Sequence, residues 1–348
     1  MKLLRPRSLV LAAVMAVSLL AVSCGGGSSS PTGGSGTASV PMAKVTFQLN
    51  WLPNVQHFGP VYASRQGLYK EMNLDVDLKP GGQGIDGLQM VVGGAADIAL
   101  SSAPNLFAAN EKGADLVAFA AVFQSSASAL VCRQDRKIST FSDIAGKNFG
   151  SKGPSDEDKL PRLLKKTGID PKNIKIRPIG ASSITEIIAG VVDCQLAFAV
   201  NEPITMRKAG VEPVVFHLSD YGLGGQGEIY ITRRDFYEKN PEVLVRFLQA
   251  TAKAWNVFLD DPTAAAQYIG DSKLIDGLDV EQQKGQAKAM AGLISSSNTK
   301  ENGLLYLNKE LWEQQAAQTL EEGRITKLPD MEKVRPFTIL QKASLPKR

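Results

Sequence analysis

Short segments in which apolar and polar residues alternate take turns with stretches of helical periodicity along most of this chain. Residues 45–49 alternate as a strand, residues 60–72 have the pattern of a helix, and residues 74–78 alternate again. A helix is predicted to follow the Gly-rich segment 81–84, ending at Gly93-Gly94, where glycine favours a left-handed helix end. Alternating strands and helices predict a largely parallel sheet with helices on its faces.

A second unit of the same design follows the apolar run 116–132, which the polar segment Gln124-Ser125-Ser126 interrupts. One long strand bent at this point would suit a crossover between two lobes. Both units place a helix, then Gly-x-x-Asp, then a strand, at Gly94–Leu100 and at Gly190–Val200. This weak internal duplication predicts two similar lobes rather than one continuous sheet.

Other element boundaries follow from capping residues. A helix is predicted from Ser155 to Gly168, and Ser183 with Glu186 forms the pattern of a capping box. After Gly222 the chain is expected to return to the first lobe. There an amphipathic helix follows Asn240-Pro241 and places Trp255 on its apolar stripe.

The first residues of the chain have the pattern of an export signal. Lys2, Arg5 and Arg7 precede an apolar run from Leu9 to Val22, which is too short to be a membrane-spanning helix. Cys24 follows after Ser23 and resembles the acylated cysteine of a bacterial lipoprotein box. Residues 25–37 contain only Gly, Ser, Pro and Thr, a composition that suits a flexible tether. We therefore expect a signal peptide over 1–23, and a lipid-anchored protein on the outer face of the cell membrane.

Composition excludes several other classes of protein. Without the three basic residues of the signal, 36 basic residues face 35 acidic ones, so no nucleic-acid partner is indicated. Two histidines without a cluster of cysteine or acidic residues predict no metal site. Cys132 and Cys194 could pair in an oxidising compartment, but we expect two buried thiols, because free cysteine packs like a small apolar residue.

A set of short motifs, in order along residues 44–340, resembles solute-binding proteins related to the thiamine-pyrimidine-synthase family. The motifs are Asn50-Trp51-Leu52-Pro53-Asn54 with His57 and Gly59, Gly67-Leu68-Tyr69, Gly81-Gly82-Gln83, Gly94-x-x-Asp97-Ile98-Ala99, Gln124, Gly153-Pro154-Ser155, Asn201-Glu202-Pro203 and Asp220-Tyr221-Gly222. The resemblance implies an α/β, two-lobed periplasmic-binding fold (type II) with two crossover strands and a ligand cleft between the lobes. It also implies that the protein delivers its ligand to an ABC importer, with permease and ATPase subunits as partners.

The expected domain organisation combines the tether, the duplication and this resemblance. The lipidated cysteine and tether span 24–43, one lobe comprises 44–131 plus 222–345, and the other comprises 132–221. We expect a monomer that needs no cofactor and that touches the membrane through its anchor alone.

Relatives implied by the resemblance bind thiamine pyrimidine precursors, riboflavin, alkanesulfonates or nitrate. The loops at the predicted strand ends offer an aromatic face and neutral donors and acceptors, with Lys152 as their one basic residue. The helix starting at Ser155 carries Asp156, Glu157 and Asp158 in its first turn, where they occupy the positive end of the helix dipole. These features favour a flat, nitrogen-rich heterocycle such as riboflavin or a thiamine pyrimidine precursor over an anion. The candidate ligand-binding residues are Asn50, Trp51, Asn54, His57, Gln83, Ser101, Gln124, Ser155, Glu202 and Tyr221.

Each candidate has a structural alternative. Trp51 could be core, His57 could hydrogen-bond its own loop, Gln83 could satisfy loop amides, and Glu202 could brace the crossover strands. An enzyme is the rival class, since related eukaryotic pyrimidine synthases use a pyridoxal-bearing lysine, a histidine and a cysteine-rich iron motif. This chain has His57 but no cysteine cluster, so we expect a binding protein.

Overall fold

The computed structural model describes residues 40–82, 84–180 and 184–348, apart from the side chains of Pro154, Ser155 and Asp158. Pro41–Arg348 forms one compact unit. The signal peptide, Cys24 and the tether through residue 39 therefore lie outside the described residues, as do Gln83 and Ser183. Within the described part of the chain, none of the helices is long and apolar enough to cross a membrane.

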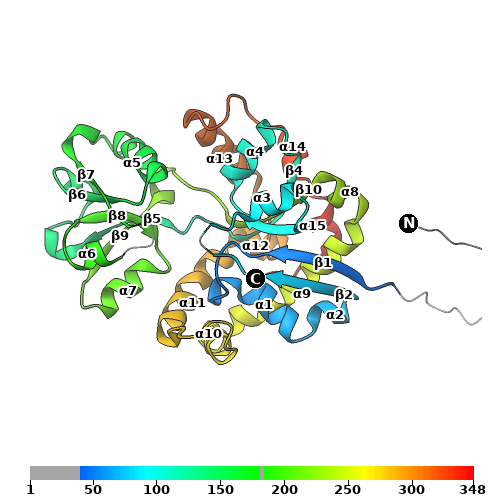
Figure 1. Cartoon of the computed structure of the whole chain (residues 1–348). Helices are drawn as coiled ribbons and strands as arrows, with labels where there is room; N and C mark the ends of the chain where they lie inside the picture. Colours follow the sequence, from blue (N-terminus) through cyan, green and yellow to red (C-terminus); the bar gives the residue numbers. More distant parts are fainter. Residues whose placement is uncertain (1–39, 83, 181–183) are drawn as a thin grey trace, which may run out of the picture. The chain divides into compact units, whose positions relative to one another are not determined.

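The described residues form two five-stranded sheets, each with helices packed on it (Figure 1). The first sheet has the order β2-β1-β3-β10-β4, and it defines lobe 1. Its strands are β1 (Ala43–Gln48), β2 (Leu74–Lys79), β3 (Ile98–Ser101), β4 (Leu116–Phe123) and β10 (Gly227–Arg233). Its helices are α1 (Phe58–Arg65), α2 (Leu68–Glu71), α3 (Gly87–Val92), α4 (Ala103–Glu111), α8 (Arg234–Lys239), α9 (Pro241–Asp260), α10 (Pro262–Asp271), α11 (Val280–Ile294), α12 (Ser297–Asn302), α13 (Lys309–Glu321), α14 (Met331–Val334) and α15 (Thr338–Ala343).

The second sheet, coloured green in Figure 1, has the order β7-β6-β8-β5-β9 and defines lobe 2. Its strands are β5 (Ser128–Arg133), β6 (Asn148–Ser151), β7 (Lys175–Pro178), β8 (Cys194–Phe198) and β9 (Pro213–His217). Its helices are α5 (Pro154–Lys166), α6 (Thr185–Ile188) and α7 (Glu202–Lys208). Short 3-10 turns are η1 (Val55–His57) in lobe 1, and η2 (Gln134–Arg136), η3 (Phe141–Ile144), η4 (Pro171–Asn173) and η5 (Leu218–Tyr221) in the segment of lobe 2.

The apolar run 116–132 is two strands in different sheets rather than one bent strand. β4 ends at Phe123 and β5 begins at Ser128, so the chain passes between the sheets over residues 124–127. The expected boundary between residues 131 and 132 falls inside β5, all of which belongs to the second sheet. The chain returns between β9 and β10, after η5.

The internal duplication extends to the pairing of strands. In each sheet three consecutive strands run parallel, β1 to β3 in lobe 1 and β6 to β8 in lobe 2, and one further strand, β10 or β5, runs antiparallel to its two neighbours. In lobe 1 the Asp97 carboxylate accepts a hydrogen bond from the Thr46 amide at 2.8 Å, and in lobe 2 Asp193 accepts one from the Asn148 amide at 2.9 Å. The repeated Gly-x-x-Asp motif thus fastens a strand to its parallel neighbour in both lobes.

The inner strands of each sheet are buried on both faces, as strands between helices require, whereas the edge strand β7 is exposed. On one face of the first sheet Phe47, Phe119 and Tyr230 pack with α9, whose Trp255 is fully buried as the stripe predicts. On the other face Ala118, Ile229 and Ile231 pack with α3, α4 and α13. These cores hold the strand ends in fixed positions.

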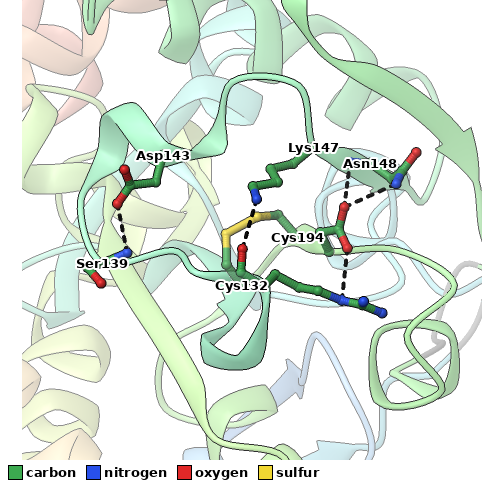
Figure 2. Close-up of a disulfide and its surroundings, with 8 residues drawn as sticks. Cys132, Ser139, Asp143, Lys147, Asn148 and Cys194 are labelled. Carbon is green, nitrogen blue, oxygen red and sulfur yellow. Dashed lines mark hydrogen bonds and ion pairs between the residues drawn. A yellow bond between two sulfur atoms is a disulfide. The ribbon is translucent and has the colours of Figure 1, made fainter.

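Cys132 and Cys194 form a disulfide, so the expectation of two free thiols is wrong. Both cysteines are fully buried, and they lie directly opposite each other on the antiparallel strands β5 and β8, with a Cα–Cα distance of 4.0 Å (Figure 2). Their separation of 62 residues concealed this pairing, because strand register is not visible in sequence spacing.

Candidate functional site

A pocket of about 450 Å³ lies where loops of lobe 1 and lobe 2 meet. This volume falls within the usual range for small-molecule sites. Most of its walls come from the loop after β1, the segment between β8 and α7, the start of β10, and α11 with the segment before it. The lining residues are Asn50, Trp51, Leu52, Asn54, Gln56, Phe198, Asn201, Glu202, Glu228, Ile275, Leu278, Gln283 and Gln286.

The loop after β1 is held rigid by its own side chains. Asn54 caps η1 by accepting a hydrogen bond from the Gln56 amide at 2.8 Å, and the Asn54 amide donates to His57 Nδ1 at 3.4 Å. The Val55 amide donates to Gln283 Oε1 of α11 at 2.8 Å. A side chain at Gly81 would collide with the backbone of residues 49–51, so the glycine lets the next loop pack directly beneath Trp51.

His57 lies beneath the pocket rather than in its wall. Its side chain is buried, and burial lowers the pKa of its imidazole to about 4. The ring is therefore neutral at physiological pH. Because Nδ1 accepts from the Asn54 amide, Nε2 carries the proton and donates to Asn50 Oδ1, 2.8 Å away.

This hydrogen bond orients Asn50, since its amide oxygen must face His57. Its Nδ2 then donates to Glu228 Oε2 at 2.9 Å. Burial raises the pKa of Glu228 to about 7, although the hydrogen bond from Asn50 lowers it in part. Glu228 is the second residue of β10 and has a φ of 51°, in the left-handed region that non-glycine residues seldom occupy.

Glu228 was not among the residues that the sequence indicated. The signal that was available is a glutamate at the edge of a buried apolar strand, directly after the polar, glycine-rich segment 224–227. A charged residue at the entrance of a core strand is uncommon unless it has a partner or a task.

Two aromatic rings, one from each lobe, line the pocket with large exposed areas. Trp51 is 43% exposed and Phe198, the last residue of β8, is 42% exposed. The exposure of Trp51 excludes the alternative that it is a core residue in this structure. The sequence does not single out Phe198, because a residue at the end of an apolar strand has the pattern of a core residue.

Glu202 and Asn201 close the pocket at the start of α7. Glu202 Oε2 accepts a hydrogen bond from the Phe198 amide at 2.9 Å, and Oε1 lies 3.6 Å from the ammonium of Lys152. Asn201 Oδ1 accepts from Gln282 Nε2 of α11 at 3.0 Å, which links α7 of lobe 2 to lobe 1. Lys152, the basic residue noted in the sequence, is thus paired with a carboxylate.

The pocket is acidic. Glu202 and Glu228 line it, whereas none of the described lining residues is a lysine or arginine. The acidic first turn of α5 is also engaged locally, since Asp156 Oδ2 accepts from the Lys152 amide at 2.9 Å and Glu157 Oε1 accepts from Ser151 Oγ at 3.0 Å. Among the described residues, no group of three or more His, Cys, Asp or Glu is placed to hold a metal ion.

The remaining predicted site residues lie elsewhere. Ser101 ends β3 and Tyr221 packs on Phe141 in lobe 2, with ring centroids 4.5 Å apart, and neither is among the described lining residues. Gln124 is buried and donates to the backbone carbonyls of Ala121 and Tyr306, so it braces the crossing between the sheets. The backbone of Ser155 lies in the first turn of α5, and its side chain is outside the described part.

Comparison with known proteins places the chain in a family. The model of the family described as NMT1/THI5 like matches residues 54–265, and the chain belongs to this family. This confirms the resemblance inferred from the ordered motifs.

Characterised relatives fall into two classes. The formylaminopyrimidine-binding protein of Halalkalibacterium halodurans is 25% identical over 228 residues, covering 65% of this chain and 69% of that protein. The riboflavin-binding protein RibY of Chloroflexus aurantiacus is 24% identical over 287 residues, covering 79% of this chain and 80% of that protein. The 4-amino-5-hydroxymethyl-2-methylpyrimidine phosphate synthase THI13 of Saccharomyces cerevisiae is 23% identical over 239 residues, covering 65% and 70%. The family thus includes binding proteins and synthases.

Solved structures confirm the fold. The periplasmic aliphatic sulphonate binding protein SsuA of Escherichia coli superimposes with a TM-score of 0.65 at 19% identity, over 85% of this chain and 92% of that one. A Candida albicans protein described as having the generic periplasmic binding protein fold superimposes with a TM-score of 0.57 at 15% identity, over 88% and 97%. The predicted α/β, two-lobed periplasmic-binding fold is therefore confirmed.

Proposed function

We propose that this protein is an extracytoplasmic solute-binding lipoprotein that captures a flat, pyrimidine-containing vitamin or vitamin precursor for an ABC importer. The observation that carries the proposal is the chemistry of the pocket. Trp51 and Phe198 present aromatic surface from two lobes, and amide and carboxyl groups surround them without a lysine or arginine among the described lining residues.

Each part of this pocket suits a heterocycle. Exposed aromatic side chains gain free energy when a planar ring stacks on them, and such stacking tolerates different rings. The amides of Asn50, Asn54, Asn201 and Gln286 can read ring nitrogens, carbonyls and amino groups. Riboflavin and thiamine pyrimidine precursors share these features, and two relatives carry the corresponding names.

An anionic ligand, such as an alkanesulfonate or nitrate, is the alternative within transport. The structural likeness to SsuA supports the shared fold rather than a shared ligand. An anion would face the carboxyl groups of Glu202 and Glu228, of which Glu202 alone has a lysine beside it among its described contacts, and α5 has its first turn occupied by carboxylates. The pocket favours a neutral or weakly basic ligand.

A pyrimidine-synthase-like enzyme is the alternative outside transport. Pyridoxal chemistry needs a lysine that forms an imine, but Lys152 is paired with Glu202, and the described lining residues include no lysine. Two of the three cysteines of the chain are joined in a buried disulfide. These observations favour binding without catalysis.

Thermal melting of the purified protein tests the proposal. A ligand at a hundredfold excess over its Kd should stabilise the folded state by about 2.7 kcal/mol. We expect the melting temperature to rise with one of riboflavin, thiamine, 4-amino-5-hydroxymethyl-2-methylpyrimidine or its formylamino analogue. Equal or larger shifts with taurine or nitrate would contradict the heterocycle proposal, and a pyridoxal absorbance band in the purified protein would favour the enzyme.

A further inference from the structure

Glu228 is the one carboxyl group of the pocket whose described contacts include no cation. Oε2 accepts one hydrogen bond, from Asn50, and Oε1 receives none from the described residues. Glu202, by contrast, has one oxygen on a backbone amide and the other beside Lys152. Glu228 is therefore the carboxyl group with an oxygen available to a ligand.

The series of hydrogen bonds from the Asn54 amide through His57 and Asn50 determines which carboxyl oxygen of Glu228 is available to a ligand. Every hydrogen bond in this series has its donor assigned, because His57 Nδ1 must accept and Nε2 must donate. Asn50 consequently presents Nδ2 to Oε2. A proton on this carboxyl group is then placed on Oε1, the oxygen that Asn50 does not contact, while Oε2 remains an acceptor.

We propose that Glu228 determines the orientation and specificity of the bound heterocycle by sharing one proton with its ring edge. In this arrangement, which rests on the function proposed above, Oε1–H donates to a ring nitrogen or carbonyl of the ligand, and Oε2 accepts from the neighbouring N–H. The ligand edge is thus an acceptor beside a donor. An aminopyrimidine has this edge in its ring nitrogen and amino group, and an isoalloxazine has it in its imide.

The protonation state of the free protein supports this arrangement. With a pKa of about 7, the carboxyl group of Glu228 gains a proton readily near neutral pH. Two other titratable groups face it: His57 through Asn50, whose pKa is about 4, and Tyr230 on the same strand, whose pKa burial raises above its ordinary value. Neither changes charge between pH 6 and 9. Among the described lining residues the other charged group is Glu202, which is paired with Lys152.

The proposal predicts how many protons the protein takes up when the ligand binds, and how affinity changes with pH. Below pH 7 the carboxyl group already holds the shared proton, so binding takes up none. Above pH 7 it is ionised, so the complex must take one proton from solvent, and affinity falls by up to tenfold for each further pH unit. A carboxyl group that merely held Asn50 in place would not couple binding to a proton in this way.

The test is isothermal titration of the purified protein with riboflavin and, separately, with 4-amino-5-hydroxymethyl-2-methylpyrimidine, from pH 6 to 9. Buffers of different ionisation enthalpy report the protons taken up on binding. We expect close to one proton taken up at the alkaline end with either compound. At pH 6 we expect almost none with riboflavin, whose imide does not titrate in this range, and proton release with the aminopyrimidine, whose ring nitrogen is partly protonated there. Which of the two compounds binds identifies the ligand edge as an imide or an aminopyrimidine.

Two substitutions at Glu228 separate the contribution of its hydrogen-bonding geometry from that of the proton that it gains. Glu228→Gln keeps an acceptor toward Asn50 and places a permanent N–H donor where the proton lay, as in amide recognition of adenine. It should bind without proton uptake and without pH dependence. Glu228→Ala should lose about 10- to 100-fold in affinity, the usual effect of deleting a charge-assisted hydrogen bond. Glu71→Gln, an exposed residue paired with Lys253, is the matched control and should behave as wild type.

Several outcomes would overturn the proposal. Wild-type affinity in Glu228→Ala, or proton uptake that persists in Glu228→Gln, would show that Glu228 does not share the proton, although the function proposed above would stand. Failure of the wild-type protein to bind either compound would overturn this proposal, whereas the proposed function would fall only if none of the four compounds of the melting experiment bound. Should Glu228→Ala melt abnormally, Glu228→Gln still decides, because its amide preserves the hydrogen bond from Asn50.

Discussion

At the scale of single residues, side chains of the same type have different environments and therefore different roles. The three tryptophans of the chain show this, because Trp51 is 43% exposed in the pocket while Trp255 and Trp312 are fully buried. The two glutamates differ in the same way, one paired with lysine and the other bound to an amide. Whether each of these side chains can contact a ligand is therefore determined by its burial and its hydrogen-bond partners in the folded protein.

We predict that Trp51→Ala weakens ligand binding and leaves the fold almost intact. Loss of one stacking surface should cost about 1–3 kcal/mol of binding free energy. Trp255→Ala is the matched contrast, since removing a buried tryptophan should cost about 3–5 kcal/mol of folding stability. Calorimetric titration and thermal melting of both variants measure the two quantities. A destabilised Trp51→Ala with wild-type affinity would remove Trp51 from the site.

Four of the candidate residues from the sequence are among those that line this pocket. Asn50, Trp51, Asn54 and Glu202 line the pocket, because loops after parallel strands gather at one edge of a sheet. His57 lies beneath the pocket, and Gln124 lies at the crossing between sheets, although both follow strands in the same manner. Glu228 and Phe198 required knowledge of which strand ends face each other across two sheets. Spacing along the chain does not contain that information.

At the scale of elements, the duplicated helix–Gly-x-x-Asp–strand unit is the most informative pattern. In both lobes its aspartate accepts a hydrogen bond from a backbone amide of the neighbouring strand. In both lobes, too, an arginine at the end of the antiparallel strand donates to a carbonyl of the helix in this unit. Arg233 donates to Val91 O of α3 at 3.1 Å, and Arg133 donates to Ile187 O of α6 at 2.9 Å. Sequence revealed the repeat because Gly and Asp are required locally. The sequence pattern does not point to the two arginines, since they lie far from the motif along the chain.

We predict that the Cys132–Cys194 disulfide stabilises lobe 2 without contributing to binding. Closing a loop of 62 residues should stabilise the folded state by about 4 kcal/mol in the chain-entropy account. Urea unfolding of the double variant Cys132→Ala/Cys194→Ala should show this loss, while the folded fraction keeps its affinity for ligand. The bridge lies in the core beneath α5, and neither cysteine is among the described lining residues.

Reductant provides the control for this prediction. Dithiothreitol added to the unfolding reaction should destabilise the wild-type protein and have no further effect on the double variant. Equal unfolding curves for the wild-type protein with and without reductant would contradict a stabilising bridge.

At the scale of the whole molecule, periodicity and the internal repeat were sufficient to predict two lobes of α/β architecture. They failed where one apolar run serves two sheets, because residues 116–132 form β4 and β5 with a four-residue crossing between them. Buried apolar residues lie on both sides of the crossing, so strand pairing is what assigns the two strands to different sheets. We propose that this crossing and the return before β10 are the hinge around which the lobes enclose solute.

The last prediction concerns the anchor, which rests on residues 1–37 of the sequence. A basic start, a short apolar run, Cys24 and a Gly/Ser-rich tether predict that the mature protein is held at the membrane by lipid on Cys24. Cys24→Ser should therefore release the folded protein into the soluble fraction, with ligand affinity unchanged, because the pocket is built from residues 50–286. Membrane fractionation and immunoblotting of cells that express each form measure this. Ser23→Ala, a small-residue change beside the cysteine, is the matched control and should remain membrane-bound. Cys24→Ser protein that stays with the membrane would contradict lipid anchoring, and would indicate that the apolar run 9–22 is retained.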